Sequence, residues 1–252
     1  MRVDVAIVPP TEAPRDQTCL VVDVLRATSV LAVLLERGIE AIYPTATIED
    51  GLALRATLVA EGNRVFLLGE RDSLPPAGFD AGNSPTALER AELRGLIAVQ
   101  ATSNGTPALL ACVGAPLVMP AAVLNAAAVT DAAIAADRDV LIVCAGLRGG
   151  FGEDDVLAAG LLANRLVAAG ATPGGPEARD ALARYAVARA DLAAAFRLTE
   201  HGAITVERGF DDDIVLCATA DRYHGVAALG EEAGRPVLRP IAPNAAKTPG
   251  AR

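Results

Sequence analysis

Residues 19–29 read CLVVDVLRATS, and this stretch sets the pattern for the rest of the chain. Its apolar residues form a run typical of a buried strand, which we expect to extend from Cys19 to Val24. Asp23 lies near the end of that run, and the polar residues that follow mark the start of a helix predicted over residues 28–37. A strand, a short polar turn and a helix in this order form the repeating unit of an α/β fold.

The same alternation continues along the chain beyond this unit. Short apolar runs predict further strands at residues 3–8, 39–43, 65–68, 96–100, 140–143 and 214–218. Longer segments rich in alanine and leucine predict helices at residues 47–61, from 85 onward, and at 106–112, 124–136, 154–169 and 177–198. The pattern predicts a three-layer α/β/α fold with a largely parallel or mixed central sheet.

The length of 252 residues suits one large domain or two small ones. We expect a single compact domain over residues 1–242. The segment 171–176 is rich in glycine and proline and is the best candidate for a hinge or a surface loop. Residues 243–252 are expected to form a flexible tail.

The composition limits the classes of partner. Apolar residues make up 52% of the chain, and 31 acidic residues outnumber 22 basic ones, which gives a net charge of −9. Such a chain lacks the basic footprint of nucleic-acid binding and the polybasic patch of a membrane-surface protein, so we expect neither partner. The first residues do not resemble a signal peptide and no run suits a membrane span, so we expect a cytoplasmic protein.

Two further features concern packing. The four cysteines are widely spaced and form no C-x-x-C pair, which predicts buried free thiols. The mean hydropathy of +0.35 is high for a chain of this charge and is consistent with a homo-oligomer.

Polar and glycine residues gather at the ends of four predicted strands. Ligands of α/β sheets bind outside the carboxyl ends of the strands, so these segments are the candidates for a site. They cover residues 23–29, 69–85, 101–106 and 144–155. Each segment taken alone also has a structural explanation, as an ion pair, a helix cap or a surface loop. Together they predict one cleft that is rich in anion donors and carboxylates.

Several of these segments carry donors suited to a phosphate or a sulfonate. Arg26 offers a planar guanidinium fork, while Thr28, Ser29 and the run Thr102–Thr106 stand where helices begin and backbone N–H groups are free. A Walker lysine is absent, which excludes a P-loop nucleotide site. The single lysine, Lys247, lies in the expected tail and argues against Schiff-base chemistry.

The segment 144–155 ends with the acidic residues Glu153, Asp154 and Asp155 at a predicted helix start. Carboxylates there favour the positive end of the helix dipole. They also suit Mg²⁺, which prefers oxygen ligands, and the two interpretations are compatible. A cleft with acids, a guanidinium and free N–H groups favours metal-assisted hydrolysis of a phosphate ester.

Two features near the C-terminus receive structural interpretations. His201 precedes Gly202 and is interpreted as a cap at a helix end. The acidic run Asp211–Asp213 is interpreted as a solvated segment that leads into the strand predicted at 214–218. Spacing alone defines no Ser–His–Asp or Cys–His set.

These motifs, in this order, resemble those of the 2-phosphosulfolactate phosphatase family, also called the ComB-like family. The full matches are DVLRATS at Asp23–Ser29, GER at Gly69–Arg71, GFDAGNSP at Gly78–Pro85 and TSNGT at Thr102–Thr106. Partial matches lie at Asn125–Ala126, Ala145–Asp154, His201–Gly202 and Gly209–Ile214. The resemblance covers roughly residues 2–228.

The resemblance implies a Mg²⁺-dependent phosphoric monoester hydrolase that converts 2-phosphosulfolactate to sulfolactate and phosphate, a step of coenzyme M biosynthesis in some archaea. We expect the substrate to be that compound or a related phospho-2-hydroxy acid. The expected partner is therefore a small anionic molecule that carries a phosphate and a second anionic group.

The resemblance also suggests roles for individual residues. The expected catalytic residues are Asp23, Arg26, Glu70 and Arg71. The expected substrate-binding residues are Thr28, Ser29, Asn83, Ser84, Ser103, Asn104, Gly105, Thr106, Asn125 and Arg148. The expected Mg²⁺ ligands are Asp23, Glu70, Glu153 and Asp154. Arg71 and Arg148 are assigned to the second anionic group.

Three alternatives stay open at this point. The phosphorus could be attacked by a metal-activated water or by Asp23 itself, which would form a phosphoaspartate. The chain could be another hydrolase or lyase that acts on a small anionic carboxylate. It could also be a non-catalytic anion-binding module, although such a module gains nothing from carboxylates beside its arginines.

Overall fold

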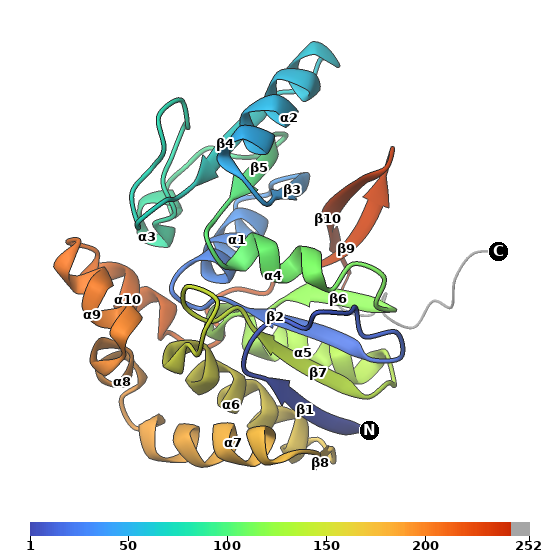
Figure 1. Ribbon diagram of the computed structural model, residues 1–252, viewed down its shortest axis with the longest axis vertical. Coiled ribbons are helices and arrows are strands. Elements are labelled where there is room, and N and C mark those ends of the chain that lie inside the picture. The colour runs from blue at the N-terminus through green and yellow to red at the C-terminus, as the bar shows by residue number, and fades with distance from the viewer. Residues whose placement is uncertain (243–252) are drawn as a thin grey trace.

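The strands form two five-stranded sheets in the computed structural model, which describes residues 1–242 (Figure 1). The first sheet is parallel throughout and has the strand order β6-β2-β7-β1-β8. Its strands are β1 (Arg2–Ala6), β2 (Thr18–Val22), β6 (Leu117–Pro120), β7 (Val140–Cys144) and β8 (Thr172–Pro173). The strand within residues 19–29 is β2, which lies between the edge strand β6 and the central strand β7.

The second sheet is mixed and has the order β4-β5-β3-β10-β9. Its strands are β3 (Ala41–Thr45), β4 (Val65–Gly69), β5 (Ile97–Ala101), β9 (Val226–Glu232) and β10 (Arg235–Ile241). The first three are parallel to one another, whereas β9 and β10 form an antiparallel hairpin that joins the sheet at β3. The division of the strands into two sheets is a feature that the sequence pattern does not reveal.

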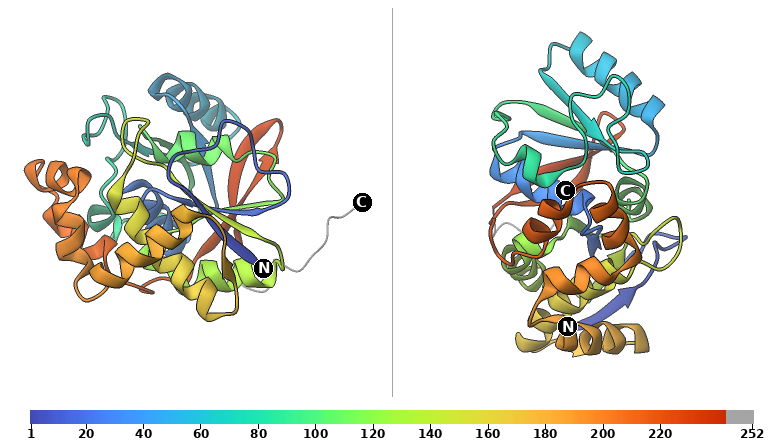
Figure 2. Two further views of the ribbon diagram at one scale, coloured as in Figure 1. Left: turned by 60° about the horizontal axis from the view of Figure 1, so that its bottom comes forward. Right: turned by 90° about the vertical axis from the view of Figure 1, so that its left-hand side faces the viewer.

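Helices cover both sheets, and the predicted three-layer α/β/α class is confirmed. The helices in the first half are α1 (Ala27–Glu36), α2 (Ile48–Ala60), α3 (Pro85–Leu88), α4 (Gly105–Ala111), the 3-10 turn η1 (Val123–Asn125) and α5 (Ala126–Ala135). Those in the second half are α6 (Glu153–Ala168), α7 (Pro176–Ala188), α8 (Leu192–Leu198), α9 (Glu200–Glu207) and α10 (Asp211–Cys217). Helices α8, α9 and α10 lie together on the side of the molecule opposite the β9–β10 hairpin (Figures 1 and 2).

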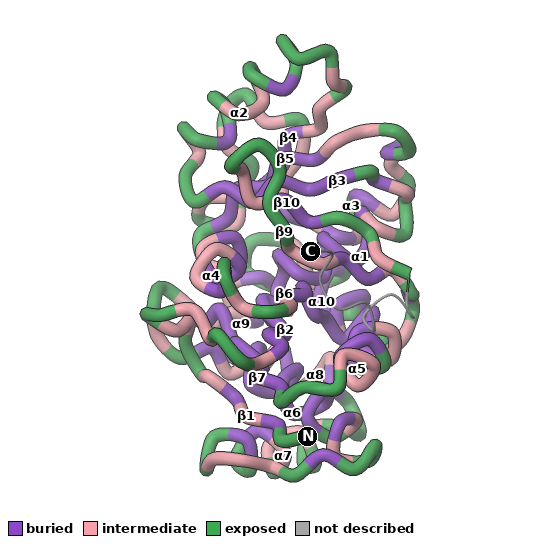
Figure 3. Tube along the Cα trace, turned by 90° about the vertical axis from the view of Figure 1, so that its right-hand side faces the viewer, coloured by how far each residue is buried: buried purple, intermediate pink, exposed green. Residues whose placement is uncertain are grey.

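The two faces of β2 belong to different cores. Leu20 and Val22 pack with the apolar faces of α5, α6 and α7, while Cys19 and Val21 pack with α1 and α4 on the other face. This second core also contains residues of β3, β4 and β5, so α1 lies between the two sheets. Helix α2 covers the far face of the second sheet. Figure 3 shows the result, since β2 is buried throughout and β7 and α1 are buried over most of their length.

Several local expectations are confirmed. Thr47 caps α2 by accepting a hydrogen bond from the Asp50 N–H at 3.0 Å, and Ser84 caps α3, whose first residue is Pro85. All four cysteines are buried free thiols. No helix within residues 1–242 is long and apolar enough to cross a membrane.

The strand predicted at residues 214–218 is wrong. Residues 214–217 belong to α10, whose first turn is the acidic run Asp211–Asp213, and Ala218 caps the helix. Three carboxylates at a helix start complement the helix dipole, and this local preference outweighs the β-branched character of Ile214 and Val215. The helix predicted at 177–198 is interrupted after Ala188, where Asp191 caps the separate helix α8.

Other segments differ from the sequence interpretation in smaller ways. Strands β6, β9 and β10 were not predicted, since β6 is short and β9 and β10 carry many charged residues. The segment 171–176 contains β8, which pairs with β1, so it is attached to the sheet edge. The tail predicted at 243–252 lies outside the described residues, and the single domain stays a prediction.

The contact between α6 and α7 generates a test of the fold. A Cβ atom on Gly160 would meet the backbone carbonyl of Ala181 and lie 2.6 Å from the Cβ of Tyr185. Gly160→Ala is therefore expected to lower the free energy of unfolding by roughly 1–3 kcal/mol, although alanine is the better helix former. Urea denaturation measures this change.

Gly51→Ala in α2 is the matched control. The nearest atom to its new Cβ would be the Thr45 Oγ1 at 3.2 Å, and no backbone atom of another element lies as close. We expect this control to change the free energy of unfolding by less than about 1 kcal/mol. Equal stability of the Gly160→Ala protein and the unmutated protein would contradict the close packing of α6 on α7.

Candidate active site

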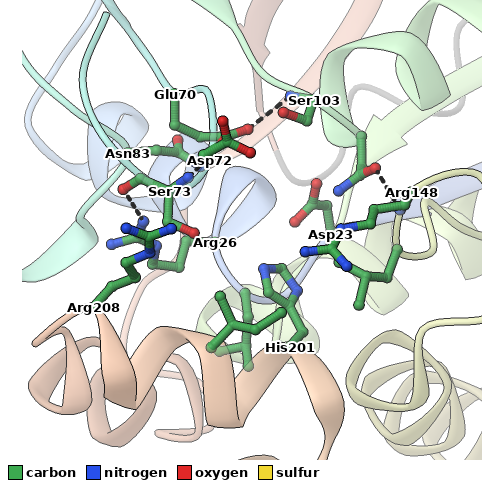
Figure 4. A pocket seen from close by; sticks show the side chains of 14 residues that line it. Asp23, Arg26, Glu70, Asp72, Ser73, Asn83, Ser103, Arg148, His201 and Arg208 are labelled. Carbon is green, nitrogen blue, oxygen red and sulfur yellow. Dashed lines mark hydrogen bonds between the residues drawn. The ribbon is translucent and has the colours of Figure 1, made fainter.

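A cavity of about 110 Å³ lies where the two sheets and the C-terminal helices meet (Figure 4). Its walls come from the segments that follow β2, β4, β5 and β7, together with one face of α9. The four polar segments singled out in the sequence thus all contribute residues to one cavity, as the ends of parallel strands in an α/β fold would place them.

Asp23 follows β2 and is the most buried carboxylate in the cavity wall, with 5% of its surface exposed. Its Oδ1 accepts a hydrogen bond from the Ala27 N–H at 3.3 Å. Burial, together with the neighbouring charges of Asp154 and Glu70, raises the pKa of Asp23 to about 6 against the lowering effect of His201. Asp23 is thus a carboxylate whose ionisation the fold disfavours.

Gly105 allows the start of α4 to approach Asp23 closely. A Cβ at this position would lie 2.7 Å from the Asp23 Oδ2 and 2.5 Å from the Cβ of Ala27. Only glycine fits here. Gly105 itself does not line the cavity, and its expected role in substrate binding stays a prediction.

Glu70 connects the segments that follow β4 and β5. Its carboxylate accepts hydrogen bonds from the Ser103 N–H at 2.7 Å and from the Ser73 N–H at 3.1 Å. Figure 4 shows Glu70 on the wall opposite His201, with Asp72 beside it. The two backbone bonds fix the position of the carboxylate at the cavity edge.

Arg26 is buried, with 4% of its surface exposed, and it is held on three sides. It forms an ion pair with Asp213 at 2.7 Å and donates to the carbonyl of Ser73 at 3.0 Å. Its guanidinium carbon lies 4.2 Å from the ring centre of Phe210, a cation–π contact. The interpretation of Asp213 as part of a solvated run is wrong, since Asp213 is buried and also accepts a hydrogen bond from the Ser84 hydroxyl.

His201 lines the cavity from the first turn of α9, so its interpretation as a cap at a helix end is wrong. Its Nδ1 lies 3.1 Å from the Oδ2 of Asp154, which is itself buried. Burial lowers the pKa of His201, but the hydrogen bond to Asp154 and the negative charges of Asp154 and Asp23 together outweigh burial and leave the pKa raised. Asp154 therefore acts on the cavity through His201.

Asn83, Ser103, Asn104 and Arg148 also line the cavity, as predicted for a substrate site. The Oδ1 of Asn83 accepts a hydrogen bond from Gln100, which leaves its amide N–H groups for the cavity. The Oδ1 of Asn104 accepts one from the backbone of Arg148, which links the segments after β5 and β7. Figure 4 shows the Arg148 side chain reaching in toward Asp23 and His201.

Four other residues that were expected to bind the substrate form hydrogen bonds with backbone groups instead. Thr28 bonds both the N–H and the carbonyl of Asp23, and Ser29 donates to the carbonyl of Val24. Thr106 donates to the Thr102 carbonyl, and Asn125 bridges Ala122 and Gly225. These side chains hold the segments that carry the site and do not line the cavity.

Three more predicted residues also lie outside the cavity wall. Arg71 donates to the carbonyls of Glu70 and Ala46. Glu153 forms an ion pair with Arg184 at 3.0 Å. Ser84 donates to Asp213 and so supports Arg26 indirectly.

The structure adds cavity residues that the motifs did not identify, namely Asp72, Ser73, Ile204 and Arg208. Ile204 and Arg208 lie three and seven residues after His201, which is the spacing of one helix face. A helix predicted at residues 200–207 would place Ile204 and Arg208 on the same face as His201, and this is the sequence signal for the two residues.

The cavity presents oxygen donors of the kind that Mg²⁺ prefers. Asp23, Glu70 and Asp72 contribute carboxylates to its wall, and Ser103 contributes a hydroxyl oxygen. Within residues 1–242, no cluster of three or more His, Cys, Asp or Glu side chains is arranged to hold a metal. Mg²⁺ in phosphoryl-transfer sites is commonly held by one or two carboxylates plus the substrate, so the oxygen donors fit this ion.

The fold and site define an α/β protein with a cavity suited to a small anion, and comparison with known proteins identifies the family. The family model described as 2-phosphosulpholactate phosphatase matches residues 7–232. The chain belongs to this family, whose enzyme class, phosphoric monoester hydrolase, is the class that the motifs predicted.

Individual relatives agree with this assignment. A protein of Deinococcus radiodurans is 39% identical over 220 residues, which cover 86% of this chain and 89% of the relative. A protein of Thermus thermophilus is 36% identical over 242 residues, which cover 94% and 98% of the two chains. Both relatives are named probable 2-phosphosulfolactate phosphatase.

The raised pKa of Asp23 predicts how the free energy of unfolding changes with pH. Between pH 4 and 6 the folded protein binds more protons at Asp23 than the unfolded chain does, so the free energy of unfolding falls as pH rises. Asp23→Asn removes this penalty and is expected to stabilise the metal-free protein at pH 7.5 by up to about 3 kcal/mol. Urea denaturation with EDTA at pH 7.5 and pH 4 tests this, since the gain should vanish at pH 4.

A second prediction concerns the buried ion pair. Asp213→Ala leaves the Arg26 guanidinium without its carboxylate, and we expect the free energy of unfolding to fall by roughly 3–5 kcal/mol. Asp212→Ala, one residue earlier and exposed, is the control and should lose less than about 1 kcal/mol. Similar losses of unfolding free energy in both proteins would show that the buried ion pair contributes no more to stability than the exposed aspartate does.

Proposed function

We propose that the protein is a Mg²⁺-dependent phosphatase that hydrolyses 2-phosphosulfolactate, or a related phospho-2-hydroxy acid, to the 2-hydroxy acid and phosphate. The observation that carries this proposal is a buried carboxylate, Asp23, in a cavity that Arg26, Arg148 and Arg208 also line. The guanidinium groups suit an anionic substrate, and the carboxylate suits chemistry at phosphorus. The family and the names of its members supply the substrate.

The residues divide into those that bind the phosphate and those that act on it. The Asn83 amide, the Ser103 hydroxyl and the Arg148 guanidinium offer donors for the phosphoryl oxygens. Asp23 either attacks phosphorus or orients a water that does so. When Asp23 attacks phosphorus, the ester P–O bond breaks and a phosphoaspartate forms, whose P–O bond is then broken by water. When water attacks directly, the ester P–O bond breaks in that step. In both routes water supplies the new P–O bond of the released phosphate, and the leaving ester oxygen takes up a proton.

His201 is placed to provide that proton. It lies in the cavity with Asp154 behind it, and the hydrogen bond to Asp154 favours the protonated imidazole. Arg26 contributes mainly by fixing the loop that carries Ser73, because its own donors are engaged by Asp213 and Ser73.

Asp23 and Glu70 are the residues that would hold Mg²⁺. When bound, the ion would offset the negative charge of the phosphoryl oxygens. Asp154 contacts His201 and Glu153 contacts Arg184, so neither belongs to the proposed ligand set. A cytoplasmic location, a role in coenzyme M biosynthesis and a homo-oligomer remain predictions.

Phosphate release from racemic 2-phosphosulfolactate tests the proposal. The protein should release phosphate with Mg²⁺, lose that activity in EDTA and regain it when Mg²⁺ is restored. Asp23→Asn should reduce turnover by at least about 10³-fold while the far-UV circular dichroism is unchanged. Asp212→Asn, an exposed change outside the cavity, should retain full activity.

Each part of the proposal has its own contrary outcome. Release that persists in EDTA would refute the metal requirement, and full activity of Asp23→Asn would remove Asp23 from the reaction. Release from 2-phospholactate but not from 2-phosphosulfolactate would assign the site to another phospho-2-hydroxy acid. Turnover of unphosphorylated acids alone would identify a different hydrolase or lyase.

A further inference from the structure

One face of α9 forms a wall of the cavity. His201, Ile204 and Arg208 are spaced by three and four residues, so they lie on the same side of the helix, and all three line the cavity. Seven residues of helix separate the first from the last, a rise of about 10 Å. The face therefore presents an imidazole, an aliphatic side chain and a guanidinium in sequence along the wall.

Arg208 differs from Arg26 and Arg148, the other arginines of the cavity wall, because no carboxylate in the described part of the chain pairs with it, whereas Arg148 lies 3.7 Å from a carboxylate oxygen of Glu200. Arg26 is committed to Asp213 and to the Ser73 carbonyl. Arg71 is committed to two backbone carbonyls and lies outside the cavity wall. Arg208 thus brings an uncompensated positive charge to the cavity.

The placement of Arg208 separates it from the reacting centre. Figure 4 shows Arg208 on the side of the cavity that carries Arg26 and Ser73, while Arg148 reaches in from the other side beside Asp23. A phosphate positioned for reaction at Asp23 is therefore close to Arg148. A second anionic group on the same substrate would repel the phosphate if it shared that position, and the opposite wall offers it Arg208.

We propose that Arg208 is a specificity-determining residue whose guanidinium binds the non-reacting anionic group of the substrate, a sulfonate or a carboxylate. Ile204, which lies between His201 and Arg208 on the helix, contacts the short carbon chain that carries the phosphate and the other acid groups. This inference rests on the proposed phosphatase function for the identity of the reacting group. It reassigns to Arg208 the role expected of Arg71 and Arg148.

Kinetics with two esters test the role of Arg208. For Arg208→Gln, KM for 2-phosphosulfolactate should rise roughly 10- to 100-fold while kcat stays within about 2-fold, because the lost bond is made by ground state and transition state alike. KM for glycerol 2-phosphate, which has hydroxyl groups in place of the acids, should not change. Arg208→Lys should recover part of the loss, since it keeps the charge but not the planar fork.

Arg189→Gln is the matched control, because Arg189 caps α7 and lies outside the cavity wall. Its KM for both esters should equal that of the unmutated protein. Equal increases in KM for both esters in Arg208→Gln would overturn the proposal, since they would indicate a general effect on the site. An unchanged KM for 2-phosphosulfolactate would overturn it as well.

Calorimetry separates this inference from the proposed function. Sulfolactate and inorganic phosphate are titrated separately into the unmutated protein and into Arg208→Gln. We expect the variant to bind sulfolactate roughly 10- to 100-fold more weakly and phosphate as before. If neither ester is hydrolysed, the proposed function fails, and this titration still decides the role of Arg208: equal sulfolactate affinity in both proteins, or none in the unmutated protein, overturns it.

Discussion

The buried ion pair between Arg26 and Asp213 is the interaction on which the site depends. It joins residues 187 positions apart in the chain, one after β2 and one in α10. Through the Ser73 carbonyl and the Ser84 hydroxyl, the same two side chains also hold the long loop that follows β4. Two buried charges of opposite sign that satisfy each other's hydrogen bonds are stable only in this arrangement, so the pair fixes where the C-terminal helices stand against the strand ends.

Three buried aspartates near the cavity differ in the hydrogen bonds that compensate their burial. This difference distinguishes the aspartates that support the structure from the one that is available for the reaction. Asp155 accepts hydrogen bonds from the N–H groups of Val24 and Gly146, and burial raises its pKa well above the usual range. Asp154 is satisfied by His201. Asp23 has one long backbone bond and faces the cavity, so it is the carboxylate with capacity left for a ligand.

Local pattern predicted much of the fold and only part of the site. The motif segments lie together because each follows the carboxyl end of a parallel strand, and these ends meet at one edge of the fold. The strand, polar turn and helix of residues 19–29 already show this arrangement. Short motifs do not distinguish a side chain that faces the cavity from one that binds the adjacent backbone. Asn104 lines the cavity, whereas Thr28 bonds the backbone of Asp23. The roles of Asp213 and Arg208 depend on packing between distant segments, which periodicity does not contain.

The division into two sheets explains why the chemistry lies where it does. Asp23 extends from the first sheet and Glu70 from the second, and the core around α1 sets the distance between them. That core is filled by α1 side chains from Val30 to Leu34, all of which are buried. Because packed interiors resist small changes of volume, the position of one carboxylate relative to the other is fixed by apolar residues that never touch the cavity. The geometry of the proposed metal and phosphate site is therefore a property of hydrophobic packing as much as of its polar residues.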